Sequence, residues 1–178
     1  MSLDLRNQEG HGHTRRVCDL TVRLAQELGI GGERLLHIWR GALLHDIGSV
    51  GVPETILHKP GPLTPEEYEV VKKHPEYAYN LLSEIPFLQE AIDIPYRHHE
   101  KWDGSGYPQG LEQTDIPLAA RIFTVVDVWE AVTSNRPYRP AMGREAALRI
   151  LQAGSGTHFD PMLVDIFLQR VLPSISKG

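Results

Sequence analysis

The chain has 178 residues, of which 41% are hydrophobic, and a formal net charge of −5. This length suits one globular domain with a sizeable core, and the negative charge gives no overall reason to expect binding to duplex nucleic acid or to an anionic membrane surface. The single cysteine, Cys18, excludes an internal disulfide and is typical of a reducing cytoplasm. No apolar run is long enough to span a bilayer and no signal-peptide pattern opens the chain, so we expect a cytoplasmic domain.

Apolar residues three or four positions apart recur along the chain and predict amphipathic helices. In chain order, the expected helices cover residues 12–28, 33–46, a segment starting at 64, 75–82, 87–99, 118–134, 143–153 and 160–171. Sustained strand alternation, internal repeats and low-complexity segments are all missing from the sequence. The fold is therefore expected to be all-α, with no internal domain boundary.

Two segments between these elements carry specific local signals. In "LTPEE", Thr64 is expected to cap a helix, with Pro65 in its first turn and Glu67 completing a capping box. The stretch "KWDGSGYPQGLEQTDIP" (101–117) is rich in glycine, proline and aspartate. A long loop inside a compact helical domain is usually functional or disordered, and the aromatic and proline content here indicates an ordered, shaped loop.

The adjacent residues His45 and Asp46 end the apolar helix expected over 33–46, which is predicted to stop at Gly48. A histidine near a helix C-terminus can simply cap the last carbonyl groups. The attached carboxylate favours another interpretation, because neighbouring nitrogen and oxygen donors can reach a shared cation or two cations close together.

Asp127 lies within "ARIFTVVDVWEAVTS", where apolar residues surround it on most faces of the expected helix. Burying a carboxylate costs several kcal/mol unless it is paired or bound to metal. A buried salt bridge to an arginine is one explanation, and metal ligation is favoured because histidines are available as companions.

Further histidines stand at helix junctions, and each taken alone could be an ordinary core or surface residue. The expected ligand set is Glu9, His13, His45, Asp46, His74, His98, His99 and Asp127. Nitrogen and oxygen donors without a thiolate suit iron, manganese, zinc or nickel, and eight ligands exceed what one ion needs. We therefore expect two metal ions, with ligands for a third. The remaining histidines are assigned no role in the site: His11, His37, His58 and His158.

Three segments resemble the HD-GYP domains, a branch of the HD phosphohydrolase superfamily: "HDIGSVGVPETILHKPGPLTPEEYEVVKKHP", "HHEKWDGSGYPQGL" and "ARIFTVVDVWEAVTSNRPYR". The resemblance runs from about Glu9 to the last helix. It implies one domain over residues 1–178, of about seven helices, in which residues 1–8 are a linker or a vector remnant. It also implies a bi- or trinuclear metal centre that degrades cyclic di-GMP.

The resemblance assigns the whole ligand set, with Glu9 matching the glutamate that some members associate with a third metal. The signature tripeptide is intact at Gly106, Tyr107 and Pro108. One position departs from the family, because the usual "HDIGK" reads "HDIGS" here and Ser49 can donate a hydrogen bond but carries no charge. The basic residues expected at the substrate phosphates match Arg136 and Arg139, although helix-end salt bridging would also explain these arginines.

The expected reaction is hydrolysis of cyclic di-GMP to pGpG by a hydroxide that bridges two metals, with Asp46 bridging the ions and His45 beside it; a second hydrolysis to GMP is left open. Two alternatives stay open. One is a catalytically weak module that binds cyclic di-GMP or a cyclase partner, for which Ser49 is the support. The other is a phosphodiesterase for cyclic GMP-AMP. The resemblance further implies a diguanylate cyclase domain as partner of the GYP loop, and an N-terminal sensor or receiver domain in a longer protein.

Overall fold

The computed structural model describes residues 12–135 and 140–175. The described chain is helical, and two isolated bridges are its sole β interactions. The α-helices are α2 (His13–Glu27), α3 (Gly32–Leu43), α4 (Glu54–Leu57), α5 (Pro65–Val71), α6 (His74–Ser83), α7 (Asp93–Arg97), α8 (Leu118–Thr133), α9 (Arg144–Gly154), α10 (Pro161–Ile166) and α11 (Leu172–Ile175). Shorter turns of 3-10 helix are η1 (Ile47–Gly51), η2 (Pro86–Ala91) and η3 (Gln113–Asp115), and η4 (Phe167–Val171) is a π turn. The all-α prediction is confirmed.

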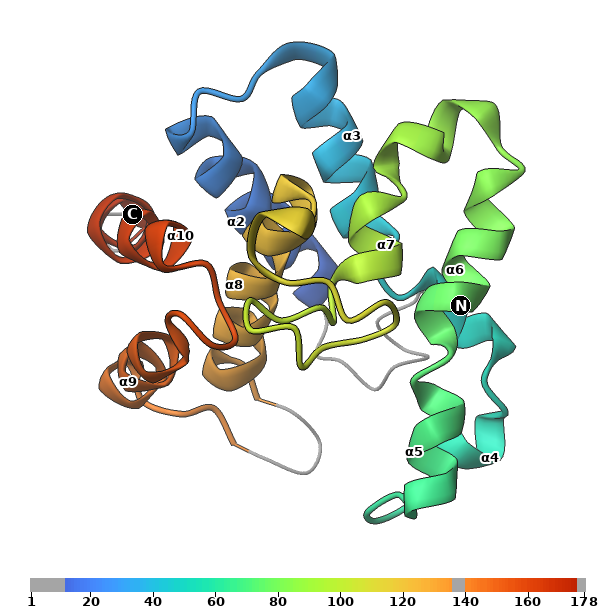
Figure 1. Ribbon diagram of the computed structural model, residues 1–178. Helices are drawn as coiled ribbons and strands as arrows, with labels where there is room; N and C mark the ends of the chain where they lie inside the picture. The colour runs from blue at the N-terminus through green and yellow to red at the C-terminus, as the bar shows by residue number, and fades with distance from the viewer. Residues whose placement is uncertain (1–11, 136–139, 176–178) are drawn as a thin grey trace.

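Helix α8 lies at the centre of the fold, with α2, α7, α9 and α10 packed against it (Figure 1). Helix α3 packs on both α2 and α7, while α6 packs on η1 and α7. Helices α5 and α4 extend from α6 on one side of the molecule (Figure 1). The N-terminal end of α2 and the C-terminal ends of α3 and α7 therefore meet beside the middle of α8.

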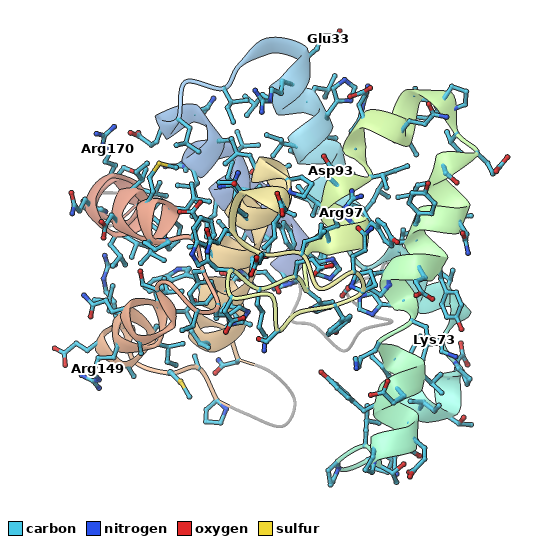
Figure 2. All side chains as sticks on the ribbon, viewed as in Figure 1. Glu33, Lys73, Asp93, Arg97, Arg149 and Arg170 are labelled. Carbon is cyan, nitrogen blue, oxygen red and sulfur yellow. The ribbon has the colours of Figure 1, made fainter. Side chains whose placement is uncertain are left out.

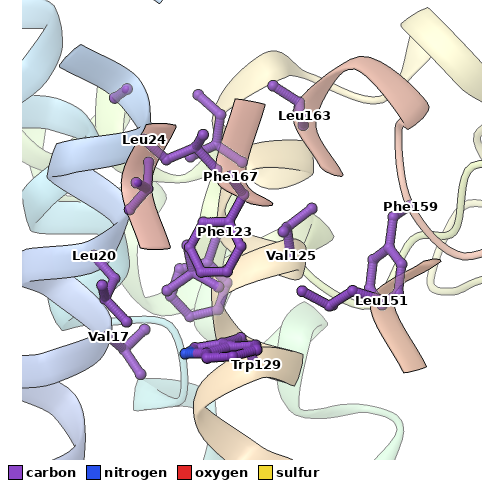
Figure 3. Close-up of a cluster of buried hydrophobic side chains, with 14 of the residues drawn as sticks. Val17, Leu20, Leu24, Phe123, Val125, Trp129, Leu151, Phe159, Leu163 and Phe167 are labelled. Carbon is purple, nitrogen blue, oxygen red and sulfur yellow. The ribbon is translucent and has the colours of Figure 1, made fainter. Parts of the chain in front are cut away.

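The hydrophobic core lies mainly between α2, α8 and α10 (Figure 3). Leu24, Phe123, Leu163 and Phe167 are at most 1% exposed. Each side chain of this size contributes on the order of 1.5–3 kcal/mol of burial free energy. The core therefore holds α8 rigidly, and α8 in turn presents Asp127 and Phe123 to the site described below.

The capping box at the start of α5 is confirmed. The Thr64 hydroxyl accepts the N–H of Glu67 at 3.3 Å, and the Glu67 carboxylate accepts the N–H of Thr64 at 2.7 Å. Glu67 also pairs with Lys59 at 2.6 Å. These contacts fix the start of α5 beside the loop that follows α4.

The helix expected over 33–46 ends earlier than predicted. Helix α3 stops at Leu43, and His45 and Asp46 lie in the turn that connects it to η1. The chain turns here because η1 packs directly on α6. At Gly48 a Cβ atom would overlap the carbonyl oxygen of His74 and lie 2.7 Å from the amide nitrogen of Ala78. Gly48 is therefore required for the approach of η1 to α6, and it does not end a helix.

The helix expected over 87–99 is divided into η2 and α7, and His98 and His99 lie in the turn after α7. Pro95 has no N–H to donate to an upstream turn, so it can stand only within the first turn of a helix that begins nearby. The last helix is longer than expected, because η4 and α11 continue α10 to Ile175. Turns as short as η1 and α4 escape prediction because apolar periodicity needs a longer window.

No helix among the described residues is long and apolar enough to cross a membrane.

Replacing Gly48 with alanine is expected to destabilise the fold by about 1–3 kcal/mol or more, the usual cost of overpacking, because the new methyl group meets backbone atoms of α6. The measurement is the urea dependence of far-UV circular dichroism. Gly31→Ala is the matched control, since a methyl group added there would have no atom of another residue within 4 Å apart from its chain neighbours. Equal free energies of unfolding for the two variants would contradict the close approach.

Candidate metal centre

Seven of the eight predicted ligands come together in the structure. They are supplied by helix ends and by one helix interior: His13 opens α2, His74 opens α6, and Asp127 lies within α8. The pairs 45–46 and 98–99 occupy the turns after α3 and α7. Glu9 lies outside the described residues.

Two groups of these side chains have the spacing that a metal ion needs, and all donor atoms within each group lie within 4.8 Å of one another. One group is His74, His98 and His99. The other is His13, His45 and Asp127. Imidazole nitrogens and a carboxylate oxygen in this arrangement suit a divalent transition metal.

Asp46 stands between the two groups. Its Oδ1 atom lies 3.5 Å from His74 Nε2 and 3.7 Å from His98 Nε2, both in the first group. Its Oδ2 atom lies 3.4 Å from His45 Nε2 in the second group. The two oxygens of one carboxylate thus face different groups, which is the geometry of a bridging ligand.

Backbone carbonyls fix the orientation of three imidazoles. His45 Nδ1 donates to Ala42 at 2.9 Å, and His74 Nδ1 donates to Val71 at 2.8 Å. His98 Nδ1 donates in the same way to the carbonyl four residues before it, at 3.0 Å. A carbonyl oxygen can only accept, so in each neutral ring the proton sits on Nδ1 and Nε2 keeps its lone pair.

Phe123 and Thr124 of α8 contact the residues of the candidate centre from the side of the hydrophobic core. The Phe123 ring centroid lies 4.9 Å from that of His45 and 5.7 Å from that of His98. The Thr124 hydroxyl lies 3.0 Å from the His98 carbonyl oxygen. The buried face of α8 therefore connects the hydrophobic core to the rings of the centre.

A second carboxylate lies behind His13 and was missed by the sequence reasoning. Glu130 is 4% exposed, pairs with Arg16, accepts the Ser134 hydroxyl at 2.7 Å and has an oxygen 4.0 Å from His13 Nδ1. The expected burial of Asp127 is wrong, since Asp127 is half-buried and lines a cavity. Glu130, three residues further along α8, is a carboxylate that pairs with an arginine.

Burial and neighbouring charges set the protonation states of the cluster. Burial lowers the pKa of His45, but the charge and hydrogen bond of Asp46, with the charge of Asp127, outweigh it and raise that pKa to about 10. Burial raises the pKa of Asp46, but the charge and hydrogen bond of His45, together with the charges of His98 and His74, outweigh burial and hold that pKa well below its usual value. Burial, reinforced by His74, lowers the pKa of His99 to about 3, and burial also lowers the pKa of His98. Near neutral pH, His98 and His99 are thus neutral and Asp46 is anionic, as metal ligands must be, whereas His45 is protonated in the metal-free protein and has to lose that proton to bind a metal ion.

A cavity of about 610 Å³ opens beside the two groups. Ser49, Tyr107 and Asp127 line it, together with His45 and Asp46. Arg136 and Arg139 lie outside the described residues. The predicted substrate side chain Ser49 is only 5% exposed, so its hydroxyl lies deep in the cavity wall.

The GYP loop is ordered against the turn that holds His98 and His99, as the sequence predicts. The Tyr107 ring stacks on His99 with centroids 4.7 Å apart, and its N–H donates to the His99 carbonyl at 3.2 Å. A Cβ on Gly106 would lie 2.5 Å from the Cα of Glu100, so only glycine fits there. The loop is placed to shape the cavity.

Glu100 holds this loop and was not singled out from the sequence. Its side chain is buried, and its two oxygens accept the N–H groups of Gln109 at 2.7 Å and Leu111 at 3.1 Å. A carboxylate directly after the two histidines and before a glycine-rich loop was the available signal. Glu100 therefore holds the loop at Gln109 and Leu111, while Tyr107 of the same loop rests on His99.

The cavity wall also includes side chains to which the sequence analysis assigned no role in the site, among them Tyr68, Lys72, Lys101 and His158. Tyr68 lies in α5 and Lys72 directly follows it, while Lys101 and His158 lie in two separate loops, which only the tertiary structure brings to the same cavity. The structure also places Lys59 against Glu67, away from the described cavity lining.

Comparison with known proteins gives consistent matches. A family model described as an HD domain matches residues 1–163. A cyclic di-GMP phosphodiesterase of Thermotoga maritima is 42% identical over 171 residues, which cover 95% of this chain and 46% of that protein. A 3'3'-cGAMP-specific phosphodiesterase 2 of Vibrio cholerae is 38% identical over 171 residues, 95% of this chain and 33% of that protein.

Among solved structures, Bd1817, an HD-GYP-type protein of Bdellovibrio bacteriovorus, superposes with a TM-score of 0.70 at 24% identity, covering 93% of this chain and 52% of that one. This likeness concerns the fold. The chain spans less than half the length of the two phosphodiesterases that it matches.

The metal-free protein, prepared by chelation, is expected to lose stability as the pH falls from about 6.5 to 4.5. The pKa of His99 is about 3 in the folded state against 6.5 when unfolded, so the unfolded state binds more protons in this window. Each such histidine contributes a slope of up to about 1.4 kcal/mol per pH unit. Urea midpoints measured at several pH values test this, with His99→Gln as the variant that should flatten the slope. A midpoint independent of pH in this window would refute it.

Proposed function

The chain belongs to the HD domain family, and from this premise we propose that it is a metal-dependent phosphodiesterase that hydrolyses cyclic di-GMP to pGpG. The matches also bear out its resemblance to the HD-GYP domains. The reaction and the substrate are carried over from relatives that are longer than this chain, and the residues of the site support them.

One observation carries the proposal: acceptor atoms of the neutral imidazole rings and of a carboxylate converge on one point, which a positive charge must occupy. His74 Nε2 lies 3.4 Å from His98 Nε2, and both rings already donate their Nδ1 proton to a backbone carbonyl. Two lone pairs and the Asp46 carboxylate therefore face one point, an arrangement that a cation stabilises.

In this proposal, His74, His98 and His99 hold one ion, while His13, His45 and Asp127 hold another. Asp46, whose two oxygens face different groups, would contribute to the binding of both ions, and Glu9 matches the position expected to serve a third metal. The oxygen and nitrogen donors without thiolate favour iron or manganese, with zinc or nickel as the other metals such a set accepts. Bound divalent ions supply Lewis acidity toward phosphoryl oxygens and lower the pKa of water toward 7.

The protein side chains then bind and orient. The carbonyl bonds at Ala42, Val71 and Ile94 keep the imidazoles in position, so little reorganisation is needed when an anionic substrate arrives. Tyr107, fixed on His99, forms one wall of the cavity, and Ser49 stands in that wall at the position where the family has a lysine. We place Arg136 and Arg139 at the substrate phosphates from the family resemblance alone.

Cyclic GMP-AMP is the second candidate substrate, because a relative with that specificity is 38% identical over almost the whole chain. A weak cyclic di-GMP-binding or cyclase-interacting module is the alternative that Ser49 supports. The seven predicted ligands among the described residues, which form two groups with Asp46 between them, favour catalysis over that alternative. A cyclase partner at the GYP loop and an N-terminal sensor or receiver domain remain predictions from the family.

The experiment that tests the function is anaerobic purification followed by elemental analysis and turnover of both cyclic dinucleotides. We expect at least about two metal ions per chain and release of pGpG from cyclic di-GMP. A metal-loaded protein that hydrolyses neither dinucleotide would refute the proposal. Faster turnover of cyclic GMP-AMP would replace the substrate and keep the reaction.

Asp46→Asn is expected to remove bound metal and activity together, because the neutral amide offers one acceptor where the carboxylate offers two anionic oxygens to the two groups. Metal content and turnover are measured on the same sample. Asp19→Asn, on the exposed face of α2, is the control and should leave both unchanged. Full turnover by the metal-depleted Asp46 variant would contradict a metal-based reaction.

Ser49→Lys is expected to tighten binding of cyclic di-GMP or raise turnover by roughly tenfold, the effect of one charge-assisted phosphate contact. The KM and kcat of the variant are compared with those of Ser174→Lys, which adds the same charge on the exposed C-terminal helix. Unchanged kinetic constants would show that the missing lysine is not what limits this protein.

A further inference from the structure

The cavity holds positively charged side chains at positions other than the one where the family has its usual lysine. Ser49 leaves the usual lysine position uncharged, and the chain as a whole carries a net charge of −5. A dianionic dinucleotide therefore needs local cations besides the metals. Among the described residues that line the cavity, Lys72 and Lys101 are the side chains with a permanent positive charge.

Lys72 lines the cavity beside the rings of Tyr68 and Tyr107. It follows α5 directly, and its N–H donates to Tyr68 at 2.9 Å, which fixes its backbone. Its Nζ atom lies 5.4 Å from the Tyr107 ring centroid and 6.0 Å from that of Tyr68. Because Tyr107 also stacks on His99, Lys72 is separated from the first metal-binding group by a single aromatic ring.

The ion pair of Lys72 does not compete strongly with a ligand. Its partner is Glu69, at 3.1 and 3.3 Å, whose side chain is 66% exposed. Exposed pairs three residues apart on a helix contribute well under about 1 kcal/mol. A phosphate entering the cavity can therefore draw the ammonium group away from Glu69.

Lys101 lines the same cavity from the start of the GYP loop, six residues before Tyr107. It is half-buried, and the adjoining loop is held by Glu100 and by the N–H of Trp102, which donates to His158 at 3.2 Å. The backbone that carries Lys101 is thus anchored at two points. Its charge also contributes to lowering the pKa of His158, after burial, which places the two side chains close together in the cavity wall.

We propose that Lys72 and Lys101 form a phosphate subsite that binds the phosphate of the cyclic dinucleotide which does not lie at the metal groups. The inference rests on the proposed function and adds to it the residues that hold the distal half of the substrate. Lysine ammonium groups bind non-bridging phosphate oxygens as point charges, and the half-exposed Tyr68 ring beside Lys72 offers a face for a base. In this chain, the subsite replaces the charge that Ser49 lacks.

The test compares two adjacent lysines. Lys72 lines the cavity, whereas Lys73 is exposed, does not line it, and lies at the junction of α5 and α6 (Figure 2). Lys72→Met and Lys73→Met remove the same charge with the same change in volume. Dissociation constants for cyclic di-GMP are measured by calorimetry, at two salt concentrations, on samples whose metal content has been determined.

Lys72→Met is expected to weaken binding about tenfold, equivalent to about 1.4 kcal/mol, while Lys73→Met and the metal content of both variants stay as in the unmodified chain. Lys72→Arg should retain most of the affinity, and Lys101→Met should weaken binding in the same direction. The salt dependence of binding should decrease in the Lys72→Met variant, because one fewer ion contact is made.

Failure of the subsite and failure of the proposed function give different results. If the unmodified chain binds neither cyclic dinucleotide, the proposed function and the subsite are both wrong. If it binds cyclic di-GMP and Lys72→Met binds equally well, the subsite is wrong and the proposed function stands. Loss of affinity in both the Lys72 and Lys73 variants would indicate a general charge effect and would also overturn the subsite.

Discussion

The site depends on one carboxylate set between two groups of imidazoles. Asp46 directs one oxygen to His74 and His98 and the other to His45. Such a carboxylate and the lone pairs that face it repel one another unless a positive charge lies among them, a proton in the metal-free protein or a cation in the loaded one. In the metal-free protein, Asp46 raises the pKa of His45, so a proton on His45 supplies this positive charge.

This requirement explains why the ligands stand at helix ends and in turns. A helix interior presents side chains at fixed intervals along one face, whereas a turn can direct neighbouring residues to different points. His45 and Asp46 in one turn, and His98 and His99 in another, each serve different partners. The rigid element is α8, whose buried face carries Phe123 beneath the rings and whose packing into the core fixes Asp127 and Glu130.

The substrate side of the cavity is built by a different set of contacts. The GYP loop is held from beneath by Glu100 and rests on His99 through Tyr107 and Gly106. Any movement of the loop would therefore shift a wall of the cavity and disturb the ring of a candidate ligand at the same time. Lys72, which directly follows α5, lies beside the same tyrosine ring. The ammonium group of Lys72 and the candidate ligand His99 therefore share Tyr107 as a neighbour.

The sequence by itself determined the helical class, the capping box at Thr64 and Glu67, and the candidate ligands, since periodicity, caps and motif spacing are local properties of the chain. It could not show that α3 stops at Leu43, since that end is set by η1 packing through Gly48 on α6, a helix that is distant in the sequence. The division of the ligands into two groups, the half-exposure of Asp127 and the pairing of Glu130 with Arg16 likewise depend on how α2 and α8 pack. Lys72 carries no local signal, and only the tertiary structure decided that it faces the cavity while Lys73 faces solvent, because the turn between α5 and α6 sets the direction of each side chain.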